Sequence, residues 1–546
     1  MPKKKKTTKY IFVVGGVMSG VGKGITTSSI GAILQARNLD VSLMKIDPYL
    51  NVDAGTMNPT EHGEVFVMDS GLETDQDMGN YERFLGKSLP RDNYMTSGMV
   101  YKHVIDKERA LGFDGKCVDP LYHITQEIHR RLEKLVKEQQ PDVLVIEIGG
   151  TVGEHNNALF IDAARQLKNK KPNDVSFVLV GYMPAPQSIG EMKTKPLQNA
   201  VVQLNSYGVQ PDFIIARAET PVDEKRKEKL SSMTGVPYEH VISAPDVDSI
   251  YAVPVNFERD GLGRHILKKL GLRARTASLE GWEALNKRRR SATKEVHIAV
   301  VGKYFSTGDY VLSDAYVSII ESLRISAYQQ KLIPVLHWIE TKNLSKKSEL
   351  QSLKKYDGIL VPGGFGSRGI EDTLKVIEFA RTNKIPYFGI CYGMQLMVAE
   401  FARNVAKLKK AHTTEVDPNT PHPVVAILPE QIQKIEQGDM GASMRLGSCP
   451  CVIKKGTHAY RAYKDTSIIE RHRHRYEVNP EYVQQLTDAG LIFSGTSPDG
   501  MLMEIAELPK KDHPFMVGAQ FHPEFLARPL DPHPLFGAFV KVCNKP

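Results

Sequence analysis

Short, continuously apolar segments alternate with helical patterns along the chain, and this alternation most restricts its fold. A strand that is apolar at every position is typical of a parallel sheet covered on both faces. Between two such segments, residues 124–140 place Ile128, Leu132 and Leu135 on one helical face before Pro141. The order predicts an α/β fold with a doubly wound, three-layer sheet. The apolar segments of the first half are residues 10–14, 41–47, 142–148, 175–182 and 212–218.

A second alternation follows a charged segment. Residues 272–294 are rich in charge and poor in apolar periodicity, which is typical of a linker. Apolar segments then resume at residues 296–304, 333–340, 357–366 and 385–393. A chain of 546 residues is too long for one core, so two doubly wound domains are expected. The predicted regions are a basic tail at 1–9, a first domain at 10–271, the linker at 272–294 and a second domain at 295–546.

Composition narrows the class of partner and compartment. The net charge of +8 suits small polyanions such as nucleotides, and is too weak to predict a nucleic-acid partner. No apolar run approaches the roughly 20 residues that a membrane helix needs, so no membrane partner is expected. Five cysteines without a C-x-x-C pair favour a reducing, cytoplasmic setting. The lysine-rich tail is interpreted as a solvated segment in preference to a nuclear-targeting signal. The sequence Cys449-Pro450-Cys451 has no nearby His or Cys at the spacing of a metal site.

A glycine-rich loop, "GGVMSGVGKG" at 15–24, follows the first apolar segment. It departs from the phosphate-binding pattern G-x-x-x-x-G-K-[ST], because five residues separate Gly16 from Gly22 and Gly24 replaces the hydroxyl residue. Its backbone N–H groups and Lys23 still suit phosphate, but Mg²⁺ then needs oxygen from elsewhere. Glu147 lies in the apolar "VLVIEI" and needs a metal or cationic partner, while Asp77 is either a second metal ligand or a solvated loop acid.

A candidate nucleophile lies in the second half. Residues 385–395 predict a strand, a G-x-C-x-G turn and a helix, which would expose Cys391 at a helix N-terminus that favours the thiolate. A small buried cysteine is the alternative. In "QFHPEF", an extended backbone would point His522 and Glu524 to the same side, completing a Cys–His–Glu triad. The glycine-rich turn at 360–369 offers N–H groups for an oxyanion.

Together, "PGGFG", "GICYGMQ" and "FHPEF" resemble the class I glutamine amidotransferase family. The resemblance implies that Cys391 is the nucleophile, His522 the general base and Glu524 the acid that orients it. It further implies that Gly364 lies at the oxyanion hole. The residues implied to bind glutamine are Gly364, Tyr392, Gly393, Met394, Gln395, Glu415 and Arg475.

Six segments of the first half resemble the CTP synthase family: "GGVMSGVGKG", "MKIDPYLNVDAGTMNPTEHGEVFV", "ETDQDMGNYERF", "EIGGTVGE", "GEMKTKP" and "DVDSIY". The resemblance implies a P-loop synthetase domain like that of dethiobiotin synthetase, joined to the glutaminase domain. The implied activity is ATP-dependent amination of UTP to CTP through a 4-phosphorylated intermediate, with ammonia taken from L-glutamine. It also implies Mg²⁺, feedback inhibition by CTP, activation by GTP and a homotetramer, and leaves filament assembly open.

The resemblance assigns further residues to these ligands. ATP would contact Gly20, Val21, Gly22, Lys23, Gly24, Ile25, Lys45 and Asp77, and Mg²⁺ would bind Asp77 and Glu147. UTP and CTP would contact Ser19, Glu154, His155, Asn156, Lys193, Thr194, Lys195, Pro196, Leu197, Gln198 and Lys227. His62 and Val65 match the region that lines the ammonia passage, and Arg368 and residues 439–447 match candidate GTP contacts.

Two positions depart from the family pattern. The chain has "GTVGEHN" where "GTVGDIE" is common, and the loss of a carboxylate at Asn156 bears on CTP feedback more than on catalysis. Tyr392 replaces a leucine, but that position mainly offers its backbone. Two other functions stay open: a cobyrinic or cobyric acid amide synthase, and a non-enzymatic regulatory or filament-forming subunit. The lysines of "KTKPLQ" argue against the first, and the complete triad and metal carboxylates against the second.

Overall fold

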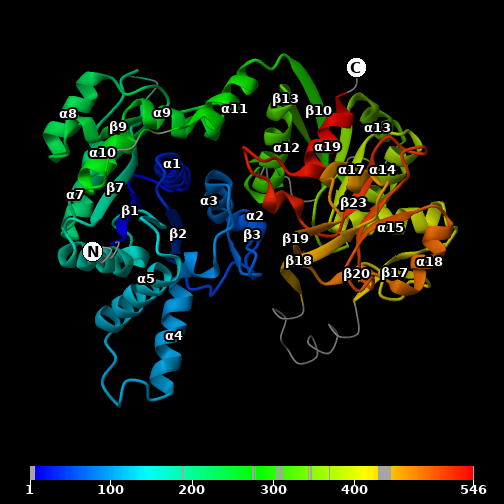
Figure 1. Cartoon of the computed structure of the whole chain (residues 1–546), viewed down its shortest axis with the longest axis horizontal. Helices are drawn as coiled ribbons and strands as arrows, with labels where there is room; N and C mark the ends of the chain where they lie inside the picture. The colour runs from blue at the N-terminus through cyan, green and yellow to red at the C-terminus, as the bar shows by residue number, and fades with distance from the viewer. Residues whose placement is uncertain are drawn as a thin grey trace, which may run out of the picture. The chain divides into compact units, whose positions relative to one another are not determined.

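The computed structural model of the chain forms two compact units (Figure 1). The first unit comprises residues 1–56 and 77–286, and the second comprises 57–76 and 287–546. The structure describes residues 7–544 except 187, 189, 274, 275, 277, 303–305, 308, 309, 312, 342, 343, 345, 346, 368 and 428–443, and except the side chains at 60, 306, 307, 310, 311, 313 and 347. Arg368 and residues 439–443, which include most of the expected GTP contacts, lie outside the described residues.

The first unit is built on a seven-stranded sheet whose strands are all parallel. Its order is β5 (Tyr94–Thr96), β2 (Val41–Asp47), β6 (Val143–Ile148), β1 (Lys9–Gly15), β7 (Val175–Tyr182), β8 (Phe213–Ala218) and β9 (Val241–Pro245). The five apolar segments predicted as strands in this half are β1, β2, β6, β7 and β8. The buried strands therefore confirm the predicted parallel sheet.

Helices cover both faces of this sheet, which confirms the three-layer arrangement. One face packs against α4 (Ser97–Arg109), α5 (Thr125–Gln139), α6 (Ala158–Lys170), α7 (Lys195–Ser206) and α8 (Glu224–Thr234). The helices α1 (Lys23–Ala36), α3 (Asp77–Leu85), α9 (Val253–Arg259) and α10 (Leu262–Lys269) pack together, and α1 and α3 also contact the strands. Short helical turns lie at 91–93, 120–124, 155–157, 238–240 and 250–252.

The segment expected to be a linker contains a helix, α11 (Glu280–Arg290). The indole of Trp282 lies 5.1 Å from the Phe84 ring and 6.2 Å from the Tyr251 ring, measured between centroids. Leu279, Trp282 and Leu285 are buried, and their spacing of three residues places them on one helical face. The charged residues around this stripe hid its periodicity. The division between the two compact units falls within α11.

The second unit contains a mixed nine-stranded sheet. Its parallel part is β13 (Leu332–Glu340), β10 (Lys294–Gly302), β14 (Gly358–Val361), β15 (Tyr387–Ile390) and β23 (Met516–Ala519). Its antiparallel part continues with β22 (Met503–Glu507), β21 (Ile492–Thr496), β18 (Arg445–Ile453) and β19 (Ser467–His474). Every apolar segment predicted in this half overlaps one of the parallel strands. The doubly wound pattern thus describes the parallel part of this sheet.

Helices also lie on both faces of the second sheet. One core contains α13 (Lys347–Gln351), α14 (Ile370–Thr382), α15 (Tyr392–Asn404) and α18 (Pro480–Asp488), and the other contains α12 (Val317–Gln329), α17 (His458–Tyr463) and α19 (Pro534–Cys543). Smaller strands are β11 (Ser306–Thr307), β12 (Tyr310–Val311), β16 (His412–Thr413), β17 (Pro423–Ile427) and β20 (Tyr476–Val478). Short helical turns lie at 313–316, 352–355 and 523–526.

An excursion from the first half of the sequence belongs to this second unit. It comprises α2 (Pro59–His62) and an antiparallel hairpin of β3 (Val65–Val67) and β4 (Glu73–Asp75). Residues 57–76 are called the hairpin segment below. The domain boundaries expected from the sequence stay a prediction, because compact units and domains need not share boundaries. No helix in the described part of the chain is long and apolar enough to cross a membrane.

Candidate functional site

The backbone at Cys391 adopts a strained conformation between β15 and α15. Its φ of +50° and ψ of −100° are unusual for a residue with a side chain. The flanking glycines are needed because the chain packs closely here. A Cβ added to Gly389 would lie 2.7 Å from the Gly393 carbonyl oxygen, and a Cβ added to Gly393 would lie 2.2 Å from the Val361 carbonyl oxygen. This is the sharp turn predicted for a nucleophile at the head of a helix.

The thiol has a histidine and a carboxylate in its surroundings. The Nδ1 atom of His522 lies 2.7 Å from Glu524 Oε1. An added Cβ on Gly363 would lie 2.8 Å from His522 Cε1 and 3.8 Å from Cys391 Cβ, so both side chains flank Gly363. Burial by itself lowers the pKa of His522, but the Glu524 carboxylate and then the Cys391 thiolate raise it to about 10. This arrangement favours a protonated, positively charged His522 ring beside the Cys391 sulfur.

The pairing of His522 with Glu524 is as predicted, but its predicted cause is wrong. Strand β23 ends at Ala519, and Glu524 lies in a 3-10 turn at 523–526. The turn, and not the two-residue repeat of an extended strand, brings the carboxylate to the ring. The Nε2 atom of His522 is buried and has no hydrogen-bond partner among the described residues, so it is available to a substrate or to the thiol.

A cavity of about 110 Å³ contains Cys391, His522 and Glu524. The glycine-rich turn contributes Gly363, Gly364 and Phe365, and the other lining residues are Pro59, Glu64, Val65, Ala315, Tyr316, Ile319, Arg473 and Phe525. The hairpin segment thus lines the cavity of the thiol, and Val65 lies in it. His62 instead pairs with Asp75, at 3.4 Å between Nδ1 and Oδ2.

The residues expected to bind glutamine surround the same turn. The Gly366 N–H donates to Glu415 Oε1 at 2.7 Å, and the Tyr392 hydroxyl donates to the Gly366 carbonyl at 2.8 Å. Gln395 donates to the Tyr476 carbonyl at 3.0 Å. Burial raises the pKa of Tyr476, as does the Glu415 carboxylate, whereas Arg475 lowers it, so both charges lie close to this ring. Gly393 and Met394 continue the first turn of α15.

The glycine-rich loop of the first unit leads from β1 into α1. Gly20 and Gly22 have φ values of +70° and +90°, which glycine adopts without strain. Val21 is buried, Ser19 is exposed, and Ile25 lies in the first turn of α1. Lys23 folds back over Gly15 and donates to the Gly150 carbonyl at 2.8 Å. Burial lowers the pKa of Lys23, and the Glu147 carboxylate opposes that shift.

Asp77 accounts for the missing hydroxyl at position 24. An added Cβ on Gly24 would lie 2.0 Å from Asp77 Oδ1. Lys45 forms an ion pair with Asp77 and lies 3.0 Å from Glu147 Oε1. Glu147 is 1% exposed, so this lysine is the cationic partner that its burial requires.

The residues fit a magnesium ion shared with nucleotide phosphates. Asp77 and Glu147 converge on one cationic atom, and carboxylate oxygens are the donors that Mg²⁺ prefers. Among the described residues, no cluster of three or more His, Cys, Asp or Glu side chains is arranged to hold a metal by itself. Phosphate oxygens and water would therefore have to complete the coordination.

The segment expected to bind the pyrimidine nucleotide lies beside this loop. An added Cβ on Gly181 would lie 2.2 Å from Leu197 Cδ1 and 3.6 Å from Val17 Cγ2, so α7 and the loop pack together there. Thr194 accepts a hydrogen bond from Gln198 at 3.1 Å, and Lys195 and Pro196 begin α7. Lys193 pairs with Glu191 at 2.7 Å.

The remaining residues that were expected to bind UTP and CTP lie in two places, one beside the glycine-rich loop and one at Lys227. Glu154, His155 and Asn156 are exposed, and an added Cβ on Gly150 would lie 2.7 Å from Glu154 Oε2. Because Lys23 donates to Gly150, this stretch adjoins the loop. Lys227 pairs instead with Asp260 at 3.2 Å, and among the described residues no ion pair joins its ammonium to the loop.

Comparisons with known proteins match the two halves of the chain to two different families. The family described as CTP synthase N-terminus matches residues 9–272, and the family described as glutamine amidotransferase class-I matches residues 311–542. A CTP synthase of Thermococcus gammatolerans is 48% identical over 98% of this chain and 99% of its own length. The chain belongs to the CTP synthase family.

Two further proteins are similar to this chain. A CTP synthase of Pyrococcus abyssi is 48% identical over 98% of both chains. The solved structure described as the Trypanosoma brucei CTPS glutaminase domain with bound acivicin is 33% identical, covering 45% of this chain and 93% of its own, with a TM-score of 0.41. As a CTP synthase family member with a glutamine amidotransferase class-I region, the chain is an enzyme.

Sequence reasoning missed several polar side chains at these sites. Arg217 on β8 lies beside the loop, because an added Cβ on Gly22 would be 3.6 Å from its Nε atom. Arg217 also pairs with Asp246 of the "DVDSIY" segment at 2.8 Å. Tyr81 donates to Glu147, and Gln520 lies 3.8 Å from the Cys391 sulfur. Gln520 and Tyr81 had a signal, since they lie in the quoted segments "QFHPEF" and "ETDQDMGNYERF".

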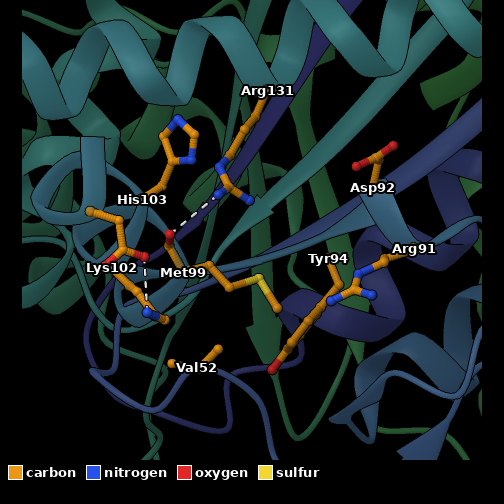
Figure 2. Close-up of a pocket in the computed structure, with 9 residues that line it drawn as sticks. Val52, Arg91, Asp92, Tyr94, Met99, Lys102, His103 and Arg131 are labelled. Carbon is orange, nitrogen blue, oxygen red and sulfur yellow. Dashed lines mark hydrogen bonds and ion pairs between the residues drawn. The ribbon is translucent and has the colours of Figure 1, made fainter. Parts of the chain in front are cut away.

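A separate pocket in the first unit contains none of the predicted site residues. It has a volume of about 240 Å³ and is lined by Val52, Arg91, Asp92, Tyr94, Met99, Lys102, His103, Asp106 and Arg131. Figure 2 shows the Arg131 guanidinium reaching the Met99 carbonyl, at 3.2 Å. Lys102 and Arg131 also pair with Asp106 and Glu127, at 2.9 and 2.8 Å. These internal pairs offset much of the positive charge, and the pocket holds no nucleophile with a paired base.

Proposed function

We propose that the chain converts UTP to CTP, with ATP as co-substrate and with ammonia that its second unit releases from L-glutamine. The observation that carries this proposal is the combination in one CTP synthase family chain of the Cys391–His522–Glu524 site and a P-loop with Asp77 beside Gly24. The first site suits thioester chemistry. The second suits phosphate binding.

In the glutaminase half, the Cys391 thiolate attacks the side-chain amide carbon of glutamine. His522 donates its proton to the leaving ammonia, and water then hydrolyses the thioester to glutamate. Glu524 holds the ring in position through its bond to Nδ1. Gly363 and Gly364 line the cavity, and their backbone N–H groups are the candidate oxyanion donors. Tyr392, Gly393, Met394, Gln395, Glu415 and Arg475 form the proposed glutamine site.

In the synthetase half, O4 of the uracil ring attacks the γ-phosphorus of ATP, and ADP leaves. Ammonia then adds at C4, the ring loses a proton, and phosphate departs with the former O4. Lys23, Lys45, Gly20, Val21, Gly22, Gly24 and Ile25 are the proposed ATP contacts. Asp77 and Glu147 would hold Mg²⁺, which neutralises phosphate charge when bound. Ser19, Glu154, His155, Asn156, the stretch 193–198 and Lys227 are proposed for UTP and for CTP as feedback inhibitor.

Other properties of the family extend this proposal. We propose that ammonia passes His62 and Val65, and Val65 supports this by lining the Cys391 cavity. GTP as activator, a homotetrameric assembly and a cytoplasmic location, where Cys391 stays reduced, belong to the same proposal.

Two assays test the proposal. Purified protein with UTP, ATP, Mg²⁺ and glutamine should give the ultraviolet shift from uracil to cytosine, and omission of any component should abolish it. Absence of CTP would contradict the proposed function. With UTP labelled by ¹⁸O at O4, the label should appear in inorganic phosphate. If it appears in water instead, the 4-phosphorylated intermediate is wrong.

A further inference from the structure

Two ion pairs connect the hairpin segment to strand β19 within the second unit. Arg473 Nε lies 2.7 Å from Glu73 Oε1, and Arg471 Nε lies 2.6 Å from Asp69 Oδ1. Arg471 also donates to the Val67 carbonyl at 3.1 Å. Its side chain is fully buried, and the Glu73 side chain is 7% exposed. The opposite partners are less buried, because the Asp69 side chain is 44% exposed and the Arg473 side chain 24% exposed. Each pair therefore has one buried charge, and it constrains geometry more than a pair that is exposed on both sides.

The main chain of the same strand contacts both residues of the thiol site. The Arg471 carbonyl accepts a hydrogen bond from the His522 N–H at 2.7 Å. The Arg473 carbonyl lies 3.8 Å from the Cys391 sulfur. The two arginines thus bind the hairpin segment with their side chains and the catalytic residues with their backbone.

Aromatic packing provides a second route from the hairpin segment to His522. The Phe66 ring lies 5.1 Å from the Phe525 ring, and Phe525 stacks on His522 at 5.2 Å, measured between centroids. The Arg471 guanidinium lies 5.3 Å from the centre of Phe66. Salt bridges and ring contacts therefore converge on the same histidine.

We propose that Glu73 is a positioning residue for the glutaminase reaction. Glu73 acts through Arg473, and together with the Asp69–Arg471 pair it fixes the position of β19. The Arg471 and Arg473 carbonyls of that strand then hold His522 and Cys391 in their positions relative to each other. The inference rests on the proposed glutaminase function of Cys391 and His522. Its consequence is that a glutaminase site depends on a segment encoded within the synthetase half of the sequence.

Glu73 is a better probe than Arg473, because Arg473 itself lines the cavity and could touch glutamine. Glu73 is not among the cavity-lining residues, and its side chain reaches the cavity wall through its ion pair with Arg473. A positioning role lowers kcat with glutamine and leaves the KM for glutamine nearly unchanged. A role in holding substrate would raise KM instead.

The experiment compares Glu73→Ala and Glu73→Gln with the unaltered chain, all at full length. Three quantities are measured: kcat and KM with glutamine, CTP formation with ammonium, and the rate at which iodoacetamide alkylates Cys391. Misplacement of reacting groups costs about tenfold to a hundredfold, so we expect a loss of that size in glutamine kcat for Glu73→Ala. Alkylation should slow as well, and ammonium-dependent CTP formation should change less than about twofold. Glu73→Gln, which can keep a hydrogen bond to Arg473, should lose less.

Glu400→Gln serves as a matched control, because it weakens another buried ion pair of this unit, with Arg381 at 2.6 Å. It should leave the ratio of glutamine-dependent to ammonium-dependent activity unchanged.

The inference is overturned if Glu73→Ala leaves glutamine kcat and alkylation unchanged, if it raises only KM, or if both activities fall together. Failure of the proposed function is recognised separately. In that case the unaltered chain makes no CTP from glutamine, or Cys391→Ala makes none from ammonium, whatever residue stands at position 73.

Discussion

The Asp77 carboxylate occupies the space that a side chain at Gly24 would need. An added Cβ at position 24 would lie 2.0 Å from Asp77 Oδ1 and 2.8 Å from Asp77 Cγ. The usual P-loop hydroxyl is therefore replaced by a carboxylate from the first residue of α3. A loop that departs from the standard pattern can in this way keep an oxygen beside the phosphate site.

Restoring the usual hydroxyl should damage the synthetase. In Gly24→Ser the new side chain collides with Asp77, displacing either that carboxylate or the start of α1. We expect CTP formation from both glutamine and ammonium to fall by about a hundredfold or more. Alkylation of Cys391 should be unchanged. Gly537→Ala, where an added Cβ meets nothing within 4 Å, is the control and should keep full activity. An active Gly24→Ser variant would show that Asp77 is not held at this position.

Removal of Lys45 should destabilise the fold through Glu147. Lys45→Met leaves a buried carboxylate without its cation, which costs about 3–5 kcal/mol of unfolding free energy. Denaturant unfolding measures the loss. Adding Glu147→Gln removes the unpaired charge and should restore part of it. Because two carboxylates then face each other without a lysine, Mg²⁺ should raise the melting temperature of Lys45→Met more than that of the unaltered chain. An equal response to Mg²⁺ would argue against a metal at these two carboxylates.

Loss of the Glu524 charge should change both activity and pH dependence. The Glu524 carboxylate is the largest influence that raises the pKa of His522, to about 10, against the lowering effect of burial. The imidazolium contributes stability that is fully present below the unfolded pKa of roughly 6.5, and this is lost as the pH rises through 10. In Glu524→Gln the folded pKa falls. The stability difference between the two proteins should therefore be largest at low pH and shrink between roughly pH 6.5 and 10.

The glutaminase rate of Glu524→Gln gives the second readout. We expect a fall of about a hundredfold, with the alkaline limb of the pH profile moved to lower pH. Thermal unfolding across the same pH range checks the stability effect. A stability difference that stays constant with pH would contradict the assigned charge state of His522.

Local sequence patterns predicted the elements and residues whose causes are local. Strand β7 follows from continuous apolar character, and the turn at Cys391 follows from its flanking glycines. The Asp77–Gly24 contact could not be found this way, because it depends on how α3 packs against α1. The same holds for Glu73 and Arg473, which are 400 residues apart in sequence. From the sequence alone, the charged side chains of the hairpin segment indicate a polar loop, because their partners on β19 are far away in the sequence.

In the proposed reaction, ammonia is made at Cys391 and used at a different site. The most direct test is CTP formation by purified Cys391→Ala with UTP, ATP and Mg²⁺, supplied with either glutamine or ammonium chloride and followed by the ultraviolet shift from uracil to cytosine. We expect no CTP from glutamine and a rate from ammonium within about twofold of the unaltered chain, because the proposed phosphoryl-transfer site is untouched. Loss of both activities, or retention of the glutamine-dependent one, would contradict the proposed reaction.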